Sequence, residues 1–358
     1  MDKFIALLDL DYFYAQCEIV RNPSLKGKPV VIVMPSLREN SGAIATCNYE
    51  ARALKIRSGM SLQLAKKLAD SSTIFINADK KYYEEISEKV FEVVDFFSES
   101  VEQVSIDEAY FDLTNPLGVD KAKESCLKIK QRIKNELGLT CSIGLSVNKV
   151  LAKIAASYKK PDGFVVVLPK EIDSFLLKQK ISVLPGVGTK TQEILNNEKI
   201  NLISDLRLVS LQKLIELFGS VKANQLFNFS LGKDDRLVIP NREKQQLSRM
   251  MTLKNDTRDF EEAKQTIDFL SDLVFKEVFK LNKQFKTVSL ILVNQNYETI
   301  TKSKTIPEKS LTIDELKETE YFLLKIFLEE SLSNIRRIGV KVSNFEDNSG
   351  YQRKLLDY

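Results

Sequence analysis

The sequence predicts an α+β protein made of several domains. The chain has 358 residues, which is enough for two or three domains. Patterns typical of strands and helices gather in two separate regions, at 1–167 and 247–345, with short helices between them. A composition of 43% hydrophobic and 28% charged residues fits a soluble globular protein that buries a sizeable core.

The first region starts with an apolar run at 4–10, which is typical of a strand buried on both faces. A second buried strand is expected at 29–34, and a helix is expected to start near Asn48. Apolar residues at helical spacing predict a helix over 79–98. The remaining elements are a strand pair over 101–113 that is broken at Asp107-Glu108, a helix around 122–133, a strand at 141–147, a helix at 149–158 and a strand at 164–168. We expect a small sheet with helices packed on one face.

The second half changes character twice. Residues 170–230 indicate short helices with tight turns, and residues 234–246 are polar and typical of a linker. Beyond them, the pattern predicts strands and helices in the order β-α-β-β-α-β. The expected strands are 247–253, 287–293, 298–305 and 335–345, and the expected helices are 260–281 and 313–331. This order is the split βαβ arrangement.

Absent residue types exclude several chemistries. The chain has no histidine, which excludes an imidazole base, a Ser-His-Asp triad and histidine metal ligands. Its four cysteines form no C-x-x-C pair, so a structural zinc site is not expected and the thiols suit a reducing cytoplasm. We find no signal peptide and no apolar run long enough for a membrane span, and we expect a cytoplasmic protein.

Net charge decides little about partners. The formal net charge is +4, and residues 247–358 carry as many acidic as basic side chains. A surface for nucleic acid would therefore need charges gathered on one face.

Three acidic residues lie at the ends of predicted apolar strands, where a buried charge would be unfavourable. Asp9 ends the first predicted strand, and Asp107 and Glu108 interrupt the strand pair. Unpaired buried carboxylates are unfavourable, and neighbouring ones raise each other's pKa. A divalent cation would remove both penalties, and all-oxygen ligands favour Mg²⁺ or Mn²⁺. Two such ions would suit in-line phosphoryl displacement. The alternative is that these acids are loop-tip residues, helix caps or members of surface ion pairs.

A second group of residues suits phosphate binding. Thr46, Tyr49 and Arg52 follow one another at three-residue spacing, so we expect them on one face of a helix start. Lys160 adds a possible positive charge. The alternative is a capped surface helix. The glycine turn at 185–188 could approach a DNA backbone, as in a helix-hairpin-helix, or simply join two helices.

Several motifs together resemble a known family. They are Asp9-Leu10-Asp11-Tyr12-Phe13-Tyr14-Ala15-Gln16, Asn48-Tyr49-Glu50-Ala51-Arg52, Ser105-Ile106-Asp107-Glu108-Ala109-Tyr110, Asn148-Lys149, Lys160-Pro161-Asp162-Gly163 and Pro185-Gly186-Val187-Gly188. Their order and spacing resemble the Y-family translesion DNA polymerases, in the DNA polymerase IV branch and most of all its archaeal members. The resemblance covers residues 1 to about 345.

The resemblance implies a right-hand polymerase with a ferredoxin-like palm, small fingers, a helical thumb and a split βαβ little finger. The implied domains are the palm at 1–10 and 78–167, the fingers at 11–77, the thumb at 168–233 and the little finger at 247–345. The polar composition places the linker at 234–246, and Ser349-Gly350 indicates a flexible tail at 346–358. The resemblance also implies a monomer that acts on primer-template DNA and deoxynucleoside triphosphates.

The resemblance assigns roles to single residues. Asp9, Asp107 and Glu108, with the Leu10 carbonyl, resemble the ligands of two Mg²⁺ ions, which Mn²⁺ can replace. Tyr14 resembles the steric gate that rejects a ribose 2′-hydroxyl. The residues that resemble the family's nucleotide-binding positions are Tyr12, Phe13, Tyr14, Ala43, Ala45, Thr46, Tyr49, Arg52 and Lys160. The implied reaction is metal-assisted nucleotidyl transfer, with low fidelity, no proofreading and lesion bypass.

Further contacts are expected with DNA and with a partner protein. The predicted DNA contacts are Pro185, Gly186, Val187, Gly188, Arg249, Arg336 and Arg337. The two last arginines are adjacent on a predicted strand, so one of them should face DNA. In the tail, Gln352, Leu355 and Tyr358 partly resemble a peptide that binds a sliding clamp.

Two other functions stay open at this point. One is a catalytically idle DNA-binding protein that recruits repair factors. The other is a metal-dependent nuclease or nucleotide cyclase with the same two-metal chemistry. The intact acidic triad disfavours the first, and the glycine turn with the trailing split βαβ region disfavours a cyclase.

Overall fold

The computed structural model describes residues 3–38, 40–240, 243–310 and 312–347. They divide into two compact units. The described residues of segments 1–34, 43–60 and 64–242 form the first unit, and those of segments 35–42, 61–63 and 243–358 form the second. Among them, no helix is both long and apolar enough to cross a bilayer.

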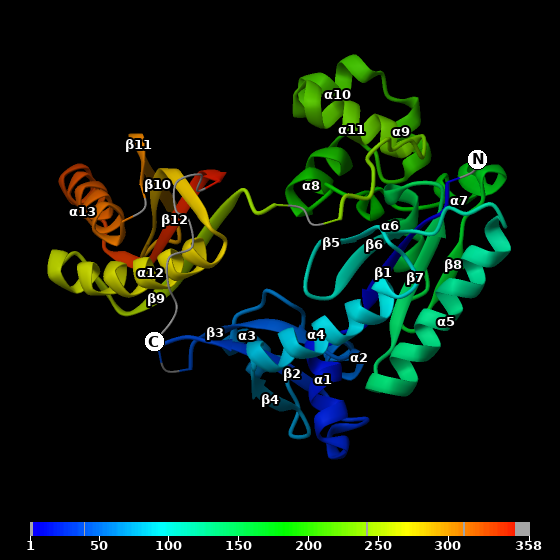
Figure 1. Cartoon of the computed structure of the whole chain (residues 1–358), viewed down its shortest axis with the longest axis horizontal. Coiled ribbons are helices and arrows are strands. Elements are labelled where there is room, and N and C mark those ends of the chain that lie inside the picture. Colours follow the sequence, from blue (N-terminus) through cyan, green and yellow to red (C-terminus); the bar gives the residue numbers. More distant parts are fainter. Residues whose placement is uncertain (1–2, 39, 241–242, 311, 348–358) are drawn as a thin grey trace. The chain divides into compact units, whose positions relative to one another are not determined.

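The first unit contains a five-stranded sheet with the order β5-β6-β1-β7-β8 (Figure 1). Its central strand is β1 (Ile5–Leu10), which is antiparallel to β6 (Glu108–Asp112) and to β7 (Cys141–Ser146). The outer strands are β5 (Val101–Gln103) and β8 (Phe164–Val166). Each predicted strand of this sheet is present, with small differences at its ends.

Helices cover both faces of this sheet. On one face, α4 (Lys80–Asp95) and α5 (Val119–Leu137) share a core with Ala6 and Leu8 of β1. On the other, α6 (Lys149–Tyr158) packs against Ile5 and Leu7. The prediction of helices on one face was therefore wrong, because the apolar β1 needs cover on both sides.

Glycine makes this second layer possible. A Cβ atom at Gly144 of β7 would lie 2.1 Å from the carbonyl oxygen of Ala152 in α6. The helix can approach the sheet this closely only where the strand has no side chain.

A smaller sheet with the order β3-β2-β4 contains β2 (Val30–Pro35), β3 (Gly42–Cys47) and β4 (Ile74–Asn77). The sequence predicted only β2, because β3 and β4 are short and lack a clear alternation. The helices of this part of the chain are α1 (Phe13–Arg21), α2 (Tyr49–Ala53) and α3 (Leu62–Leu68), with a 3-10 turn at Pro23–Leu25.

Short helices follow the five-stranded sheet, as predicted. They are α7 (Ile172–Leu176), α8 (Thr189–Asn197), α9 (Ile203–Leu208), α10 (Leu211–Phe218) and α11 (Ser220–Ser230), with 3-10 turns at Pro169–Glu171 and Ile181–Val183. Their core includes Val150, Leu151 and Ile154 of α6. One helix thus joins this helical part to the sheet.

Residues 232–239, which we call the strap, are anchored to the first unit after α11. The ammonium group of Lys149 lies 2.6 Å from the carboxylate of Glu102, and both side chains are buried. The Ile239 amide donates to Glu102 at 2.9 Å, and Lys149 donates to the Leu237 carbonyl at 3.3 Å. Polar composition alone did not indicate these anchors in the predicted linker.

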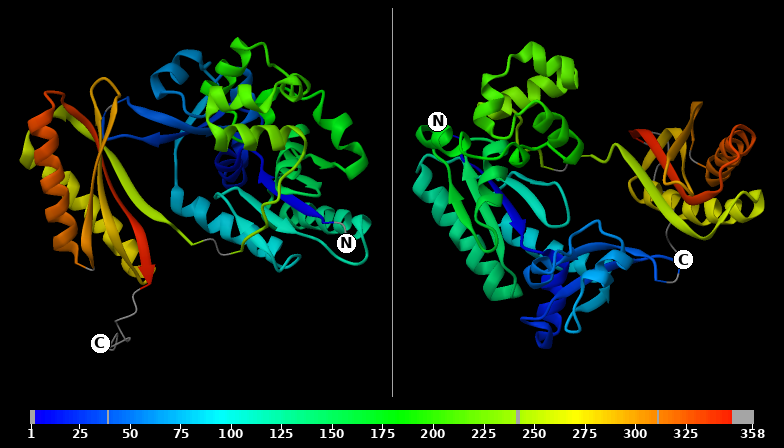
Figure 2. Two further views of the ribbon diagram at one scale, coloured as in Figure 1. Left: turned by 90° about the horizontal axis from the view of Figure 1, so that it is seen from above. Right: turned by 180° about the vertical axis from the view of Figure 1, so that it is seen from behind.

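The second unit contains β9 (Gln246–Thr257), α12 (Phe260–Lys280), β10 (Lys283–Asn294), β11 (Thr299–Ser310), α13 (Ile313–Glu330) and β12 (Ile335–Asp347). The sheet order is β11-β10-β12-β9, and all neighbours are antiparallel. Since β12 lies between β9 and β10, each helix joins two strands separated by another. This confirms the split βαβ prediction, and both helices pack on one face of the sheet (Figure 2).

Glu320 of α13 is an unusual core residue. It is fully buried, and neither carboxyl oxygen has a hydrogen-bond partner among the described residues. Burial raises the pKa of Glu320 well above 4.5. The pKa of Glu320 is therefore higher in the folded than in the unfolded protein. The contribution of this protonation to the free energy of unfolding is fully present below the unfolded pKa, and it is lost as pH rises through the folded pKa.

Replacing Glu320 with leucine should therefore raise the free energy of unfolding by about 1–3 kcal/mol, because an unsatisfied buried polar group is removed. Urea denaturation at pH 5 and pH 8 measures this gain, which should be larger at pH 8. Glu320→Gln is the control that keeps the size of the side chain but not its titration. A Glu320→Leu protein less stable at both pH values would contradict the expectation.

Candidate active site

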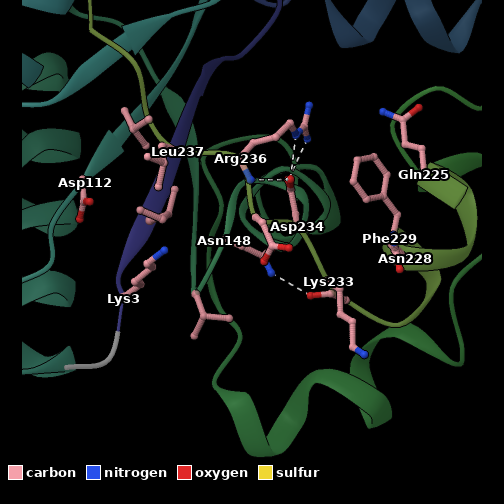
Figure 3. Close-up of a pocket in the computed structure, with 15 residues that line it drawn as sticks. Lys3, Asp112, Asn148, Gln225, Asn228, Phe229, Lys233, Asp234, Arg236 and Leu237 are labelled. Carbon is pink, nitrogen blue, oxygen red and sulfur yellow. Dashed lines mark hydrogen bonds and ion pairs between the residues drawn. The ribbon is translucent and has the colours of Figure 1, made fainter. Parts of the chain in front are cut away.

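A cavity of about 390 Å³ in the first unit gathers most of the predicted site residues. Its lining comprises Asp9, Leu10, Tyr12, Phe13, Tyr14, Ala45, Thr46, Tyr49, Arg52, Ser58, Ile106, Asp107 and Lys160. Ala43 is exposed and does not line it. A larger cavity of about 650 Å³ lies beside the strap but contains none of these residues (Figure 3). The chemistry of the lining therefore singles out the smaller cavity.

Strand pairing brings the three acidic residues together. In the antiparallel register of β1 and β6, Asp9 lies opposite Glu108. The Leu10 amide donates to the Asp107 carbonyl at 2.9 Å, which fixes the turn before β6. The end of β1 and the start of β6 thus place Asp9, Asp107 and Glu108 at one edge of the sheet.

Two lysines and a serine contact the three acids of this edge. Lys160 forms an ion pair with Asp9. Lys153 of α6 donates to both carboxylate oxygens of Glu108, at 2.6 and 2.8 Å. The Ser105 hydroxyl donates to Asp107 at 2.5 Å. With these partners, the described residues form no cluster of three acidic or thiol side chains arranged to hold a metal ion.

The electrostatics of the edge nevertheless suit a divalent cation. Burial raises the pKa of Asp9, Lys160 acts in the opposite direction, and the charges of Asp107 and Glu108 raise it further. The predicted donors are carboxylates and the Leu10 carbonyl, which are hard oxygen ligands of the kind Mg²⁺ prefers. These residues therefore fit a divalent cation such as Mg²⁺, because their negative charges repel one another and their donor atoms are all oxygens.

Aromatic rings form another part of the lining. The chain turns from β1 into α1 at Tyr12, whose φ of 37° lies in the left-handed region. Tyr14 stacks on Tyr83 with ring centroids 4.3 Å apart, and Tyr83 donates to Glu18 at 2.8 Å. Tyr12 meets Tyr49 edge to face at 5.4 Å. The Tyr14 ring is therefore held from behind by a buried partner.

The group predicted to bind phosphate is arranged differently from the expectation. Asn48 caps α2, because its side chain accepts from the Ala51 amide at 3.1 Å. The helix has only 5 residues, and Thr46 lies on β3, so the expected single helical face was wrong. Thr46, Tyr49 and Arg52 still line the same cavity because β3 leads directly into α2.

Sequence reasoning missed Lys153, Ser58 and Ile106. Lys153 had a detectable signal: it follows Lys149 by four residues in an otherwise apolar helix, so both lysines share one face. Lys149 reaches Glu102 and Lys153 reaches Glu108. Ser58 and Ile106 carried no comparable signal.

The predicted DNA contacts of the first unit lie in the turn before α8. Gly186 has a φ of 90°, and a Cβ atom at Gly188 would meet no atom within 4 Å. Space is therefore open beside Gly188, whereas Val187 of the same turn is buried. A 3-10 turn at Ile181–Val183, rather than an α-helix, precedes it.

The three arginines of the second unit differ in their surroundings. Arg249 is paired with Val340 across β9 and β12, on the sheet face that the helices cover, and its guanidinium forms an ion pair with Glu277 of α12. Arg336 lies 3.7 Å from Asp256 and stacks over Tyr297. Arg337 is exposed, and its side chain makes no hydrogen bond or ion pair within the part of the chain that the structure describes.

The predicted clamp residues Gln352, Leu355 and Tyr358 lie outside the described residues. A clamp contact through the tail stays a prediction.

Three family models match successive parts of the chain. The model of the impB/mucB/samB family matches residues 8–157, and that of its C-terminal domain matches residues 244–355. The model of the DNA polymerase iota thumb domain matches residues 182–234.

Curated relatives and solved structures agree with these matches. The chain is 37% identical to a DNA polymerase IV of Nitrosopumilus maritimus, over 99% of each chain, and 35% identical to one of Saccharolobus solfataricus, over 98% of each. A chimeric Y-family DNA polymerase of Dbh and Dpo4 has a TM-score of 0.90 at 32% identity, covering 96% of this chain and 100% of the other. An insertion ternary complex of Dbh DNA polymerase has a TM-score of 0.71 at 32% identity with the same coverage.

The fold, the acidic cavity and these full-length similarities define a nucleotide-polymerising class of enzyme. The chain belongs to the Y-family DNA polymerases, in the DNA polymerase IV branch, and is a DNA-directed DNA polymerase.

Proposed function

We propose that this protein extends a primer 3′-hydroxyl with deoxynucleoside triphosphates on template DNA, including templates with lesions, and that it does so without proofreading. The observation that carries the proposal is the cavity that joins Asp9 and Asp107 to Thr46, Arg52 and Lys160. A carboxylate edge beside hydroxyl, guanidinium and ammonium groups is the donor set that a nucleoside triphosphate and its cations require.

Each wall of the cavity has a separate task in this proposal. Arg52 and Lys160 bind the triphosphate by charge, and the hydroxyls of Thr46 and Tyr49 orient it. Tyr14 limits the space at the sugar. Ala45 leaves room over the nascent base pair, which admits distorted bases and lowers fidelity.

Asp9, Asp107 and Glu108, together with the Leu10 carbonyl, would hold the metal ions. When bound, Mg²⁺ lowers the pKa of the primer hydroxyl and neutralises charge on the departing pyrophosphate. Lys153 forms an ion pair with Glu108 and Lys160 with Asp9 at the same edge.

Primer extension on an intact template and on one with an abasic site tests the proposal. We expect nucleotide addition opposite the damaged position, with release of one pyrophosphate per nucleotide. A mismatched 3′ end should persist without excision. Degradation of the primer, or pyrophosphate release without template, would instead favour a nuclease or a cyclase.

For the second unit, we propose that Arg337 contacts the DNA backbone. Arg337→Ala should weaken binding to all sequences and reduce the slope of log affinity against log salt by about 0.9, the value for one lost phosphate contact. Arg249→Ala is the matched control, because Arg249 is engaged by Glu277. Fluorescence anisotropy over a salt series measures both slopes. If the salt slope falls equally in the two variants, Arg337 is not a more important DNA contact than Arg249.

A further inference from the structure

Asp11 is a buried carboxylate that the proposed chemistry does not use. It stands two residues beyond Asp9, is completely buried and does not line the nucleotide cavity. Its oxygens accept three hydrogen bonds: from the Thr140 hydroxyl at 2.9 Å, the Ser142 hydroxyl at 2.8 Å and the Asp162 backbone amide at 2.8 Å. A buried charge of this kind is tolerated because its oxygens are satisfied.

The position of Asp11 in the fold explains why it leaves the side of Asp9. Two residues at this spacing within a strand would point to the same face. However, β1 ends at Leu10, so Asp11 already belongs to the turn into α1. Gln16 of α1 donates to the Asp11 carbonyl at 2.6 Å and holds this turn.

The bond from Asp162 connects Asp11 to the loop that carries Lys160. Ser142 also accepts from the Gly163 amide at 3.2 Å. In addition, the Lys130 ammonium donates to the Asp162 carboxylate at 2.7 Å and to the Gly163 carbonyl at 3.2 Å. The loop is thus fixed directly after Lys160, whose ammonium group reaches Asp9 in the cavity.

We propose that Asp11 is a positioning residue: its buried carboxylate fixes the 160–163 loop, and thereby places the Lys160 ammonium where it binds the triphosphate. The inference rests on the proposed role of Lys160. The two acids of the Asp9-Leu10-Asp11 motif thus have different roles: Asp9 lines the cavity, and Asp11 fixes the 160–163 loop. Neither oxygen of Asp11 is assigned to a metal ion.

This assignment predicts a specific pattern of nucleotide affinity. Asp11→Asn removes the charge from a network of three donors, and a charge-assisted hydrogen bond is worth enough to change affinity by roughly 10- to 100-fold. We expect dNTP affinity to fall by that factor while primer-template affinity stays unchanged. In steady-state kinetics, KM should rise more than kcat falls.

A double-mutant cycle tests whether Asp11 acts through Lys160. Affinity for dNTP is measured on complexes whose primer ends in a 2′,3′-dideoxynucleotide, so that no turnover occurs. If Asp11 acts by placing Lys160, Asp11→Asn should have almost no effect in a Lys160→Ala protein. Unchanged affinity in Asp11→Asn, or full additivity of the two substitutions, would overturn the proposal.

Ser142→Ala is a milder companion variant in case Asp11→Asn fails to fold. It removes one donor to Asp11 and one acceptor of Gly163, so a smaller loss of dNTP affinity is expected, again absent in the Lys160→Ala background. No loss of affinity in Ser142→Ala would count against the proposal. Unchanged affinity in Lys160→Ala alone would instead reject the proposed triphosphate contact itself.

Discussion

Replacing Asp107 with alanine is expected to abolish nucleotide addition while leaving primer-template binding near that of the unchanged protein. Asp107 lies at the acidic edge, where it would hold a metal ion, and losing such a ligand should slow the reaction by about a thousandfold or more. DNA affinity should persist because most of it comes from phosphate contacts made elsewhere.

Single-turnover primer extension and anisotropy with labelled DNA measure the two quantities on the same protein. Glu108→Ala should behave alike, since Glu108 shares the edge. Asp95→Ala is a suitable control, because this carboxylate is exposed at the end of α4. Extension by the Asp107→Ala protein at nearly the original rate would end the metal-ligand assignment.

Tyr14→Ala should allow the enzyme to incorporate ribonucleotides. The Tyr14 ring lines the cavity and is held against Tyr83, so it cannot easily move aside for a 2′-hydroxyl. Removing the ring leaves space for this group, and discrimination against ribonucleotides should fall by roughly 10- to 100-fold.

Tyr14→Phe is the matched control for the gate. It keeps the ring and its stacking on Tyr83 but removes the hydroxyl, so discrimination should stay close to that of tyrosine. Comparison of kcat/KM for matched deoxy- and ribonucleotides measures the effect. If Tyr14→Phe loses discrimination as Tyr14→Ala does, the hydroxyl rather than the ring is responsible.

The sequence was most informative where periodicity is strong. Long apolar patterns predicted β1 and the order of strands and helices in the second unit, because burial of one or both faces leaves a regular signature. It was least informative for β3 and β4, which are 6 and 4 residues long. In such short strands, neighbours in space decide the conformation more than the local pattern does.

The acidic residues illustrate a second limit. Asp9, Asp107 and Glu108 could be selected because they interrupt apolar strands, and a resemblance supported their roles. Their partners could not be selected in the same way. Lys153 meets Glu108 across 45 residues of chain, and Asp162 meets Asp11 across 151. Pairs so distant in sequence depend on the whole topology, which a single sequence does not reveal.

The strap has a consequence for cutting the chain into independent fragments. A fragment that ends at residue 233 would lose the Ile239 amide and the Leu237 carbonyl, which satisfy the buried Glu102–Lys149 pair. Such a pair is costly to leave partly unsatisfied, so this fragment should fold poorly. A fragment that continues through Pro240 retains both groups. The polar sequence after α11 is therefore, in its first half, a part of the catalytic body rather than a spacer.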